Sequence, residues 1–238
     1  MKTVIITGIT GDIGFAIFKK FNANGYFVIG QYNSNKQKAD LLLKNYSNID
    51  LYQCDFNNLS AVEELSSVIL NKYKSIDCIV NNAGVDSQEM FQDENIELIK
   101  RITNINLLAP MVLTRELMKN MIPNKKGSIV NISSIWGKYG GSCEVAYSAS
   151  KGGLISFTKA LSKELGLSNI RVNCITCGYI DTKMNAKFTE EDKQSFCESV
   201  SLNRIGTPDE VANTVYYLSS DDASYITGQI IGVDGGFN

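Results

Sequence analysis

The residues best suited to acid–base chemistry in this chain are Tyr147 and Lys151, which stand four positions apart. On a helix, this spacing places both side chains on one face. A free tyrosine has a pKa of about 10, and a neighbouring ammonium group favours the phenolate and lowers that pKa. We therefore expect Tyr147 to act as a general acid or base assisted by Lys151, although a Tyr-x-x-x-Lys spacing also arises by chance.

The 238 residues include no histidine, which narrows the chemistry further. Ser-His-Asp and Cys-His hydrolases, His-ligated zinc sites and haem held by a proximal histidine are excluded. The 23 Lys and Arg residues nearly balance the 25 Asp and Glu residues, giving a net charge of −2. Without a basic excess, neither nucleic acid nor a membrane surface is expected as a partner.

Six cysteines are present, and in a chain long enough to bury its own core we expect free buried thiols instead of disulfides. Cys174 and Cys177 form a Cys-x-x-Cys pair, but no second half-site accompanies it, so no metal is predicted. The chain begins directly with a strand pattern, and no run of 18 apolar residues occurs. These features favour a cytoplasmic protein.

Along the chain, short apolar runs alternate with segments whose apolar residues have helical spacing. We expect seven strands, because continuous apolar runs are typical of parallel strands covered on both faces. They lie at residues 4–6, 27–29, 50–52, 78–80, 128–132, 172–175 and 230–233, and the helical patterns at 13–21, 62–73, 96–121, 146–165 and 211–218. This order predicts one α/β domain over residues 1–238, a doubly wound parallel sheet of the Rossmann type with helices on both faces. The irregular stretch 178–204 is a candidate lid.

The first strand runs into Thr7-Gly8-Ile9-Thr10-Gly11-Asp12-Ile13-Gly14 and then into a helix. Glycines in this position let the backbone approach a pyrophosphate, whose charge meets the N–H groups of the helix N-terminus. A simple tight turn would carry the same glycines, so the motif needs support from others.

Three further motifs supply it: Asn81-Asn82-Ala83-Gly84, Asn131-Ile132-Ser133-Ser134 and Tyr147-Ser148-Ala149-Ser150-Lys151. With them the chain resembles the short-chain dehydrogenase/reductase family from residue 3 to its C-terminus. Residues 204–212 and 225–236 are most similar to the 3-oxoacyl-[acyl-carrier-protein] reductase group. The resemblance implies an NAD(P)-dependent enzyme that acts on CH-OH or C=O groups.

The resemblance also implies roles for individual residues. Ser134 would hold the substrate oxygen, Tyr147 would exchange its proton, and Lys151 with Asn106 and water would complete a proton relay. The implied cofactor contacts are Gly8, Thr10, Asp12, Ile13 and Gly14 at the pyrophosphate, Asp55 at the adenine, Asn82, Ala83 and Gly84 along the ribose, Tyr32, Asn33 and Ser34 at the adenosine ribose, Gly178, Ile180 and Thr182 toward the carboxamide, and the Tyr147 and Lys151 side chains.

Three positions depart from the family pattern. Asp12 replaces the middle glycine of the first motif, where a carboxylate is awkward unless it points to solvent, and Cys177 replaces a proline before Gly178. Tyr32 stands where enzymes that require NAD place an aspartate, so a 2′-phosphate is not repelled there. Ser34, Asn35 and Lys36 can bind that phosphate. We therefore expect NADP(H) in preference to NAD(H).

The substrate is defined less sharply. Acyl-carrier protein is acidic, and Lys125 and Lys126 are candidates for docking it, although Ser168 occupies a second position expected to be basic. Met184, Phe188 and Phe196 can line an apolar pocket or pack a helix within the lid. Alternatives are a dehydrogenase of the same family acting on a sugar, polyol, steroid or small ketone, and a non-catalytic nucleotide-binding regulator. Relatives form tetramers through the two long helices, here 95–121 and 146–166, and the C-terminal strand. The resemblance therefore implies a homotetramer, and a dimer is the alternative.

Overall fold

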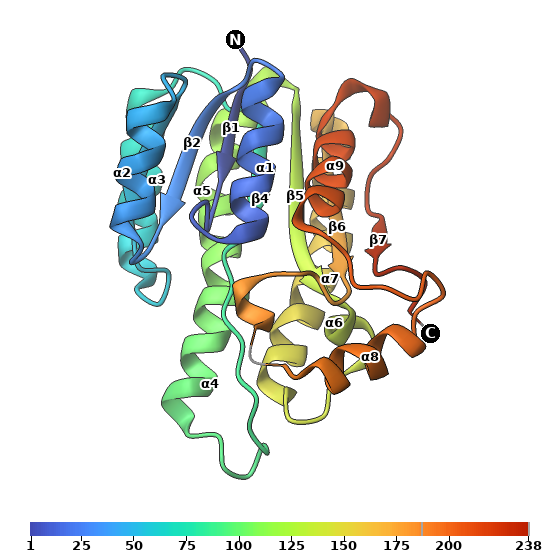
Figure 1. Cartoon of the computed structure of the whole chain (residues 1–238). Coiled ribbons are helices and arrows are strands. Elements are labelled where there is room, and N and C mark those ends of the chain that lie inside the picture. Colours follow the sequence, from blue (N-terminus) through green and yellow to red (C-terminus); the bar gives the residue numbers. More distant parts are fainter. Residues whose placement is uncertain (187, 238) are drawn as a thin grey trace.

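Seven parallel strands form one sheet, in the order β3-β2-β1-β4-β5-β6-β7 (Figure 1). The computed structural model describes residues 1–186 and 188–237. The strand order reverses direction between β1 and β4, which opens a crevice at the carboxyl ends of these strands. The predicted doubly wound fold is confirmed. The strands are β1 Thr3–Ile6, β2 Phe27–Tyr32, β3 Ile49–Gln53, β4 Cys78–Asn81, β5 Gly127–Ser134, β6 Ile170–Cys177 and β7 Ile230–Val233.

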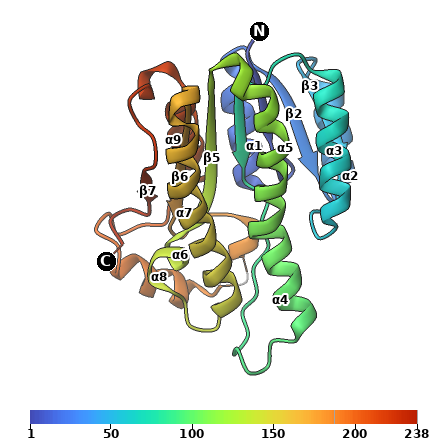
Figure 2. The same ribbon diagram turned by 180° about the vertical axis from the view of Figure 1, so that it is seen from behind.

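Helices cover both faces of the sheet, and the two views show them as separate layers (Figures 1 and 2). One layer contains α1 Asp12–Ala23, α2 Lys36–Asn45 and α9 Pro208–Ser219, and the other contains α3 Leu59–Lys72, α5 Ala109–Asn124 and α7 Val145–Leu165. Successive strand residues point to opposite layers, so Val4 and Ile6 enter one core and Ile5 enters the other. This two-sided burial explains the continuous apolar strands.

The helical segment expected at residues 96–121 is interrupted. It begins with α4 Ile96–Thr103, continues through a π-helical turn Asn104–Leu108, and ends with α5. Two helices were not predicted, α2 and α6 Ile135–Tyr139, and the lid contains the helix α8 Glu190–Glu198. Short 3₁₀ turns occupy Gly166–Ser168, Lys183–Asn185 and Asp221–Ala223. In Figure 1, α4, α6 and α8 gather at the end of the sheet where the strand arrows point.

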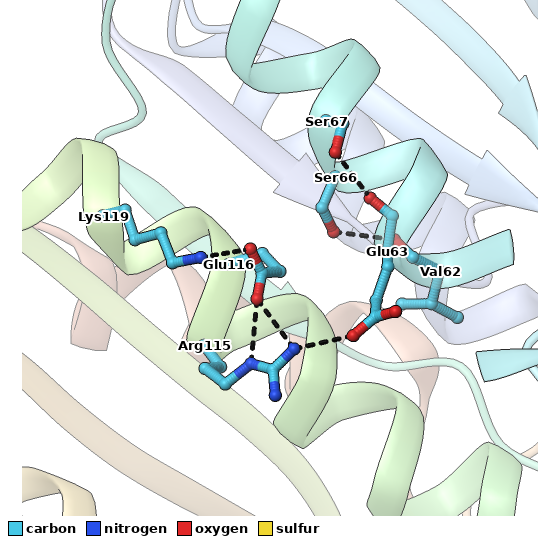
Figure 3. A network of polar contacts seen from close by, with 7 residues as sticks. All are labelled: Val62, Glu63, Ser66, Ser67, Arg115, Glu116 and Lys119. Atoms are coloured by element: carbon cyan, nitrogen blue, oxygen red, sulfur yellow. Dashed lines mark hydrogen bonds and ion pairs between the residues drawn. The ribbon is translucent and has the colours of Figure 1, made fainter. Parts of the chain in front are cut away.

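On the outer surface, α3 and α5 are joined by a chain of charged groups (Figure 3). Arg115 binds Glu63 at 2.7 Å and Glu116 at 2.8 Å, and Glu116 also pairs with Lys119. Beneath this network the two helices share a buried apolar cluster that includes Ile69 and Leu113.

The cysteines form no disulfide: all six thiols are unpaired, four of them buried, and Cys174 and Cys177 both belong to β6. Among the described residues, no helix combines the length and apolar character needed to span a bilayer.

Candidate active site

A cavity of about 820 Å³ lies at the carboxyl ends of the strands and collects nearly all the predicted site residues. Seventeen of the nineteen line it, including Ser134, Tyr147 and Lys151. The other lining residues among them are Gly8, Thr10, Asp12, Ile13, Gly14, Asn33, Ser34, Asp55, Asn82, Ala83, Gly84, Gly178, Ile180 and Thr182. Tyr32 and Asn106 lie outside the lining.

We call residues 7–14, which lead from β1 into the first turn of α1, the phosphate loop. It is so tightly packed that only glycine fits two of its positions, Gly8 and Gly14. Gly8 has a φ of +66°, and a Cβ there would lie 2.9 Å from the Cα of Ala83. A Cβ on Gly14 would collide with the carbonyl oxygen of Gly8. The loop thus leaves a backbone cradle at the N-terminus of α1, which fits the pyrophosphate of a dinucleotide.

Two side chains that were not predicted hold this cradle in place. Gln31 accepts a hydrogen bond from the Gly8 amide at 2.9 Å and donates to the Cys54 carbonyl at 2.7 Å. The Thr7 hydroxyl accepts from the amides of Asn82 and Ala83, both at 2.9 Å. A buried glutamine within the apolar strand β2 was the available signal for Gln31.

The structure corrects the assignment of the adenosine end. The Tyr32 side chain is buried in the core and does not line the cavity, and Lys36 is exposed and absent from the lining too. Lys38 lines the cavity instead, beside Asn33, Ser34 and Asn35. Asn35 caps α2, since its Oδ1 accepts from the Lys38 amide at 3.1 Å. The Lys38 Nζ lies 4.7 Å from the centroid of the Phe15 ring.

The catalytic candidates come from β5 and α7. Ser134 ends β5, and its hydroxyl accepts from the Trp136 amide at 3.2 Å. Ser133 points elsewhere, since its hydroxyl donates to the Lys151 carbonyl. Lys151 Nζ donates to the Ile132 carbonyl at 2.9 Å and lies 5.7 Å from the centroid of the Tyr147 ring.

Burial dominates the electrostatics of these groups. It raises the pKa of Tyr147, while a hydrogen bond with Ser134 acts in the opposite direction. It also lowers the pKa of Lys151 to about 8. The expected lowering of the Tyr147 pKa is therefore not seen in the chain by itself: desolvation outweighs the hydrogen bond with Ser134, and Tyr147 is a protonated donor at neutral pH.

Asn106 lies in the π-helical turn and is completely buried. Its Oδ1 accepts from the Val85 amide at 2.9 Å, and its Nδ2 donates to the Val85 carbonyl at 2.8 Å and to Ser150 Oγ at 3.1 Å. A Cβ on Gly84 would lie 3.3 Å from Lys151 Nζ and 3.4 Å from Asn106 Oδ1. Asn106 thus joins the loop after β4 to α7, immediately behind Lys151.

Aromatic rings form one wall of the cavity. The predicted Met184, Phe188 and Phe196 line it, together with Trp136, Tyr179 and Phe237. Phe196 stacks on Phe237 with ring centroids 5.4 Å apart, and Tyr179 lies 5.3 Å from Phe196. These rings come from α6, the lid and the C-terminal segment, and together they make this wall of the cavity apolar.

The candidate docking lysines lie elsewhere. Lys125 and Lys126 directly precede β5, whereas Ser134 ends that eight-residue strand. Within one chain these lysines therefore lie at the amino ends of the strands, opposite the cavity, and they do not line it.

Comparisons with known proteins agree with this geometry. A family model described as enoyl-(acyl carrier protein) reductase matches residues 8–238. The chain is 38% identical to the uncharacterized oxidoreductase YmfI of Bacillus subtilis, covering 100% of this chain and 99% of the relative. It is 40% identical to the 3-oxoacyl-[acyl-carrier-protein] reductase FabG of Rickettsia felis, covering 99% and 96%.

Among solved structures, one from Agrobacterium tumefaciens, provisionally assigned as a gluconate dehydrogenase, superposes with a TM-score of 0.92. It is 26% identical, and the match covers 98% of this chain and 94% of the other. With the fold, the glycine cradle and these relatives in agreement, the chain belongs to the short-chain dehydrogenase/reductase family of NAD(P)-dependent oxidoreductases, which act on CH-OH and C=O groups.

Proposed function

We propose that this protein is a cytoplasmic reductase that uses NADPH to convert a ketone into an alcohol. The observation that carries the proposal is that one cavity holds both the glycine cradle and the Ser134, Tyr147 and Lys151 side chains. When bound, the nicotinamide cofactor supplies the hydride. The six unpaired thiols fit a reducing compartment.

The chain's own residues would manage the oxygen and the proton. Ser134 binds the carbonyl oxygen, and Tyr147 donates its phenolic proton to that oxygen as negative charge develops. The buried Lys151 ammonium stabilises the resulting phenolate, since a desolvated cation acts strongly on a nearby anion. Asn106 bonds to Ser150 on α7 and to Val85 in the loop after β4, which fixes α7, and with it Lys151, relative to that loop.

The preference for NADPH rests on the rim of the cavity. Lys38 supplies a cation, and Ser34 and Asn35 supply polar groups, at the end of β2 where a 2′-phosphate would lie. No aspartate follows β2 to repel that phosphate, because the segment reads Tyr32-Asn33-Ser34-Asn35.

For the substrate we propose a 3-oxoacyl thioester. The named relatives support it, and the aromatic wall beside Tyr147 would accept an acyl chain. Docking of an acyl-carrier protein on Lys125 and Lys126 would need a neighbouring subunit, since these lysines lie far from the cavity of their own chain. A sugar or polyol dehydrogenase is the second candidate, favoured by the likeness to the Agrobacterium structure.

Turnover with acetoacetyl thioesters, cyclic ketones and sugars, followed at 340 nm with NADPH, tests the proposal. Tyr147→Phe should lower kcat by about a thousandfold while NADPH binding stays within twofold, because only the proton donor is lost. Near-normal turnover in this variant would remove Tyr147 from its role. If no carbonyl compound in the panel is reduced, the proposed function itself is contradicted.

A further inference from the structure

Asp12 occupies a position where the family pattern has glycine, and its carboxylate is engaged on both sides. Oδ2 accepts a hydrogen bond from the backbone amide of Lys183 at 2.8 Å. Oδ1 lies 4.0 Å from Lys38 Nζ, and both of these side chains are only 28% exposed. The carboxylate thus points toward the lid and a lysine, and not to open solvent.

Backbone contacts attach the lid near its two ends, and Phe196 stacks on Phe237 between them. At its start, the Asp181 amide donates to the Gly206 carbonyl at 2.9 Å, and Ile180 forms a bridge with Gly206. At its end, Val200 forms a bridge with Phe237. Between these anchors, the Lys183 amide donates to the Asp12 carboxylate, and both residues line the cavity. Thr182, the residue before Lys183, lines the cavity too.

We infer that Asp12 is a positioning residue that fastens the first turn of the lid, Lys183–Asn185, to the phosphate loop and so fixes Thr182 over the cofactor site. The inference deepens the proposed function and rests on it for the identity of the cofactor. A glycine in this position has no side-chain acceptor and cannot make the connection.

The arrangement also explains how a carboxylate is tolerated beside a pyrophosphate. Asp12 is the first residue of α1, where the helix dipole favours negative charge. The Lys38 ammonium and the Lys183 side chain bring two cations to the same rim. Burial, and after it the Lys183 charge, lowers the pKa of Lys38, while Asp12 acts in the opposite direction. An anionic ligand therefore meets a site whose negative group is already compensated.

Three variants separate the hydrogen bond from the charge. Asp12→Asn removes the charge but keeps an oxygen that can accept from the Lys183 amide, whereas Asp12→Ala removes both. Asp209→Ala is the matched control, because Asp209 is also an acidic residue in the first turn of a helix, α9, and pairs with Lys19 away from the cavity.

Hydrogen exchange of the cofactor-free protein is the primary measurement, read on a peptide covering residues 181–186. We expect exchange at the Lys183 amide to be about tenfold faster in Asp12→Ala, and within about threefold of the unaltered chain in Asp12→Asn and Asp209→Ala. Equal exchange in Asp12→Ala and the unaltered chain would overturn the inference.

Binding supplies the second measurement, through the fluorescence of NADPH. Because both Asp12 variants lose the charge, the comparison between them isolates the connection to the lid: Kd should be about fivefold higher in Asp12→Ala than in Asp12→Asn. Equal Kd values would show that Asp12 acts through charge only and contradict the inference. Exchange needs no turnover, so its outcome stays separate from any failure of the proposed reaction.

Discussion

At the scale of single residues, Lys38 provides a cation where two cofactors differ by one phosphate. We expect Lys38→Ala to lower kcat/KM for NADPH about tenfold more than kcat/KM for NADH, since both cofactors meet a less compensated Asp12 but only NADPH loses an ammonium–phosphate contact. Lys36→Ala is the control, because Lys36 is exposed and does not line the cavity. An equal loss with both cofactors would show that Lys38 does not read the 2′-phosphate.

The buried Lys151 ammonium has a thermodynamic cost that follows from its pKa. Burial lowers this pKa from 10.5 to about 8, so between these values the unfolded chain binds the proton and the folded chain does not. Stability therefore rises with pH across this window. Below pH 8 the cost is fully present, and the shift corresponds to about 3 kcal/mol.

Replacing this lysine should accordingly stabilise the protein while abolishing turnover. In Lys151→Met we expect the free energy of unfolding at pH 7 to rise by about 1 kcal/mol or more, since the lost hydrogen bond to the Ile132 carbonyl offsets part of the gain. Urea unfolding of both proteins at pH 7 and pH 9.5 measures the effect. The difference should shrink at the higher pH, and a difference independent of pH would contradict the assigned cause.

At the scale of elements, α3 and α5 show which contacts hold two helices together. Leu113 is 1% exposed in their shared cluster, and Leu113→Ala should lower the free energy of unfolding by about 2–5 kcal/mol. Arg115→Ala should lower the free energy of unfolding by only a small fraction of that amount, because Arg115 and Glu63 are 58% and 52% exposed and exposed ion pairs are screened (Figure 3). A larger loss from Arg115→Ala than from Leu113→Ala would reverse this ranking.

The elements that sequence patterns predicted are those with enough buried apolar residues. The seven strands are apolar on both faces, so their positions followed from the runs themselves. Helix α2 was missed because only Ala39 and Leu42 are buried in it, which leaves too little periodicity to detect. The π-helical turn at Asn104–Leu108 was missed because it arises where Asn106 bonds to the distant Val85 and Ser150.

The same distinction applies to the site. Motif residues such as Gly8, Ser134 and Tyr147 were predictable because short spacings and strand ends locate them. Lys38 was not, because its approach to the cavity depends on where α2 packs, and the partner of Asp12 was not, because Lys183 is 171 positions away along the chain. Long-range pairs of this kind are set by the fold and leave no local pattern.

At the scale of the whole molecule, two surface features could contact another subunit: an edge strand and exposed apolar side chains on the long helices. Strand β7 ends the sheet and has a neighbour on one side only, and the long helices expose apolar side chains, with Ile96 61% and Met111 38% exposed. Edges and apolar patches of this kind mark association sites. Because the exposed strand and the exposed helix side chains lie on different parts of the molecule, we propose a homotetramer with two distinct interfaces.

Light scattering coupled to size exclusion tests this assembly. Met111→Lys places a charge on the expected helix interface, and we expect it to shift the mass from tetramer toward dimer, since the β7 interface remains intact. Leu41→Lys is the matched control: Leu41 is 57% exposed on α2, which Figures 1 and 2 show at the other edge of the molecule, so its replacement should leave the mass unchanged. A monomeric unaltered protein would rule out the assembly, and a tetrameric Met111→Lys variant would move the interface away from α5.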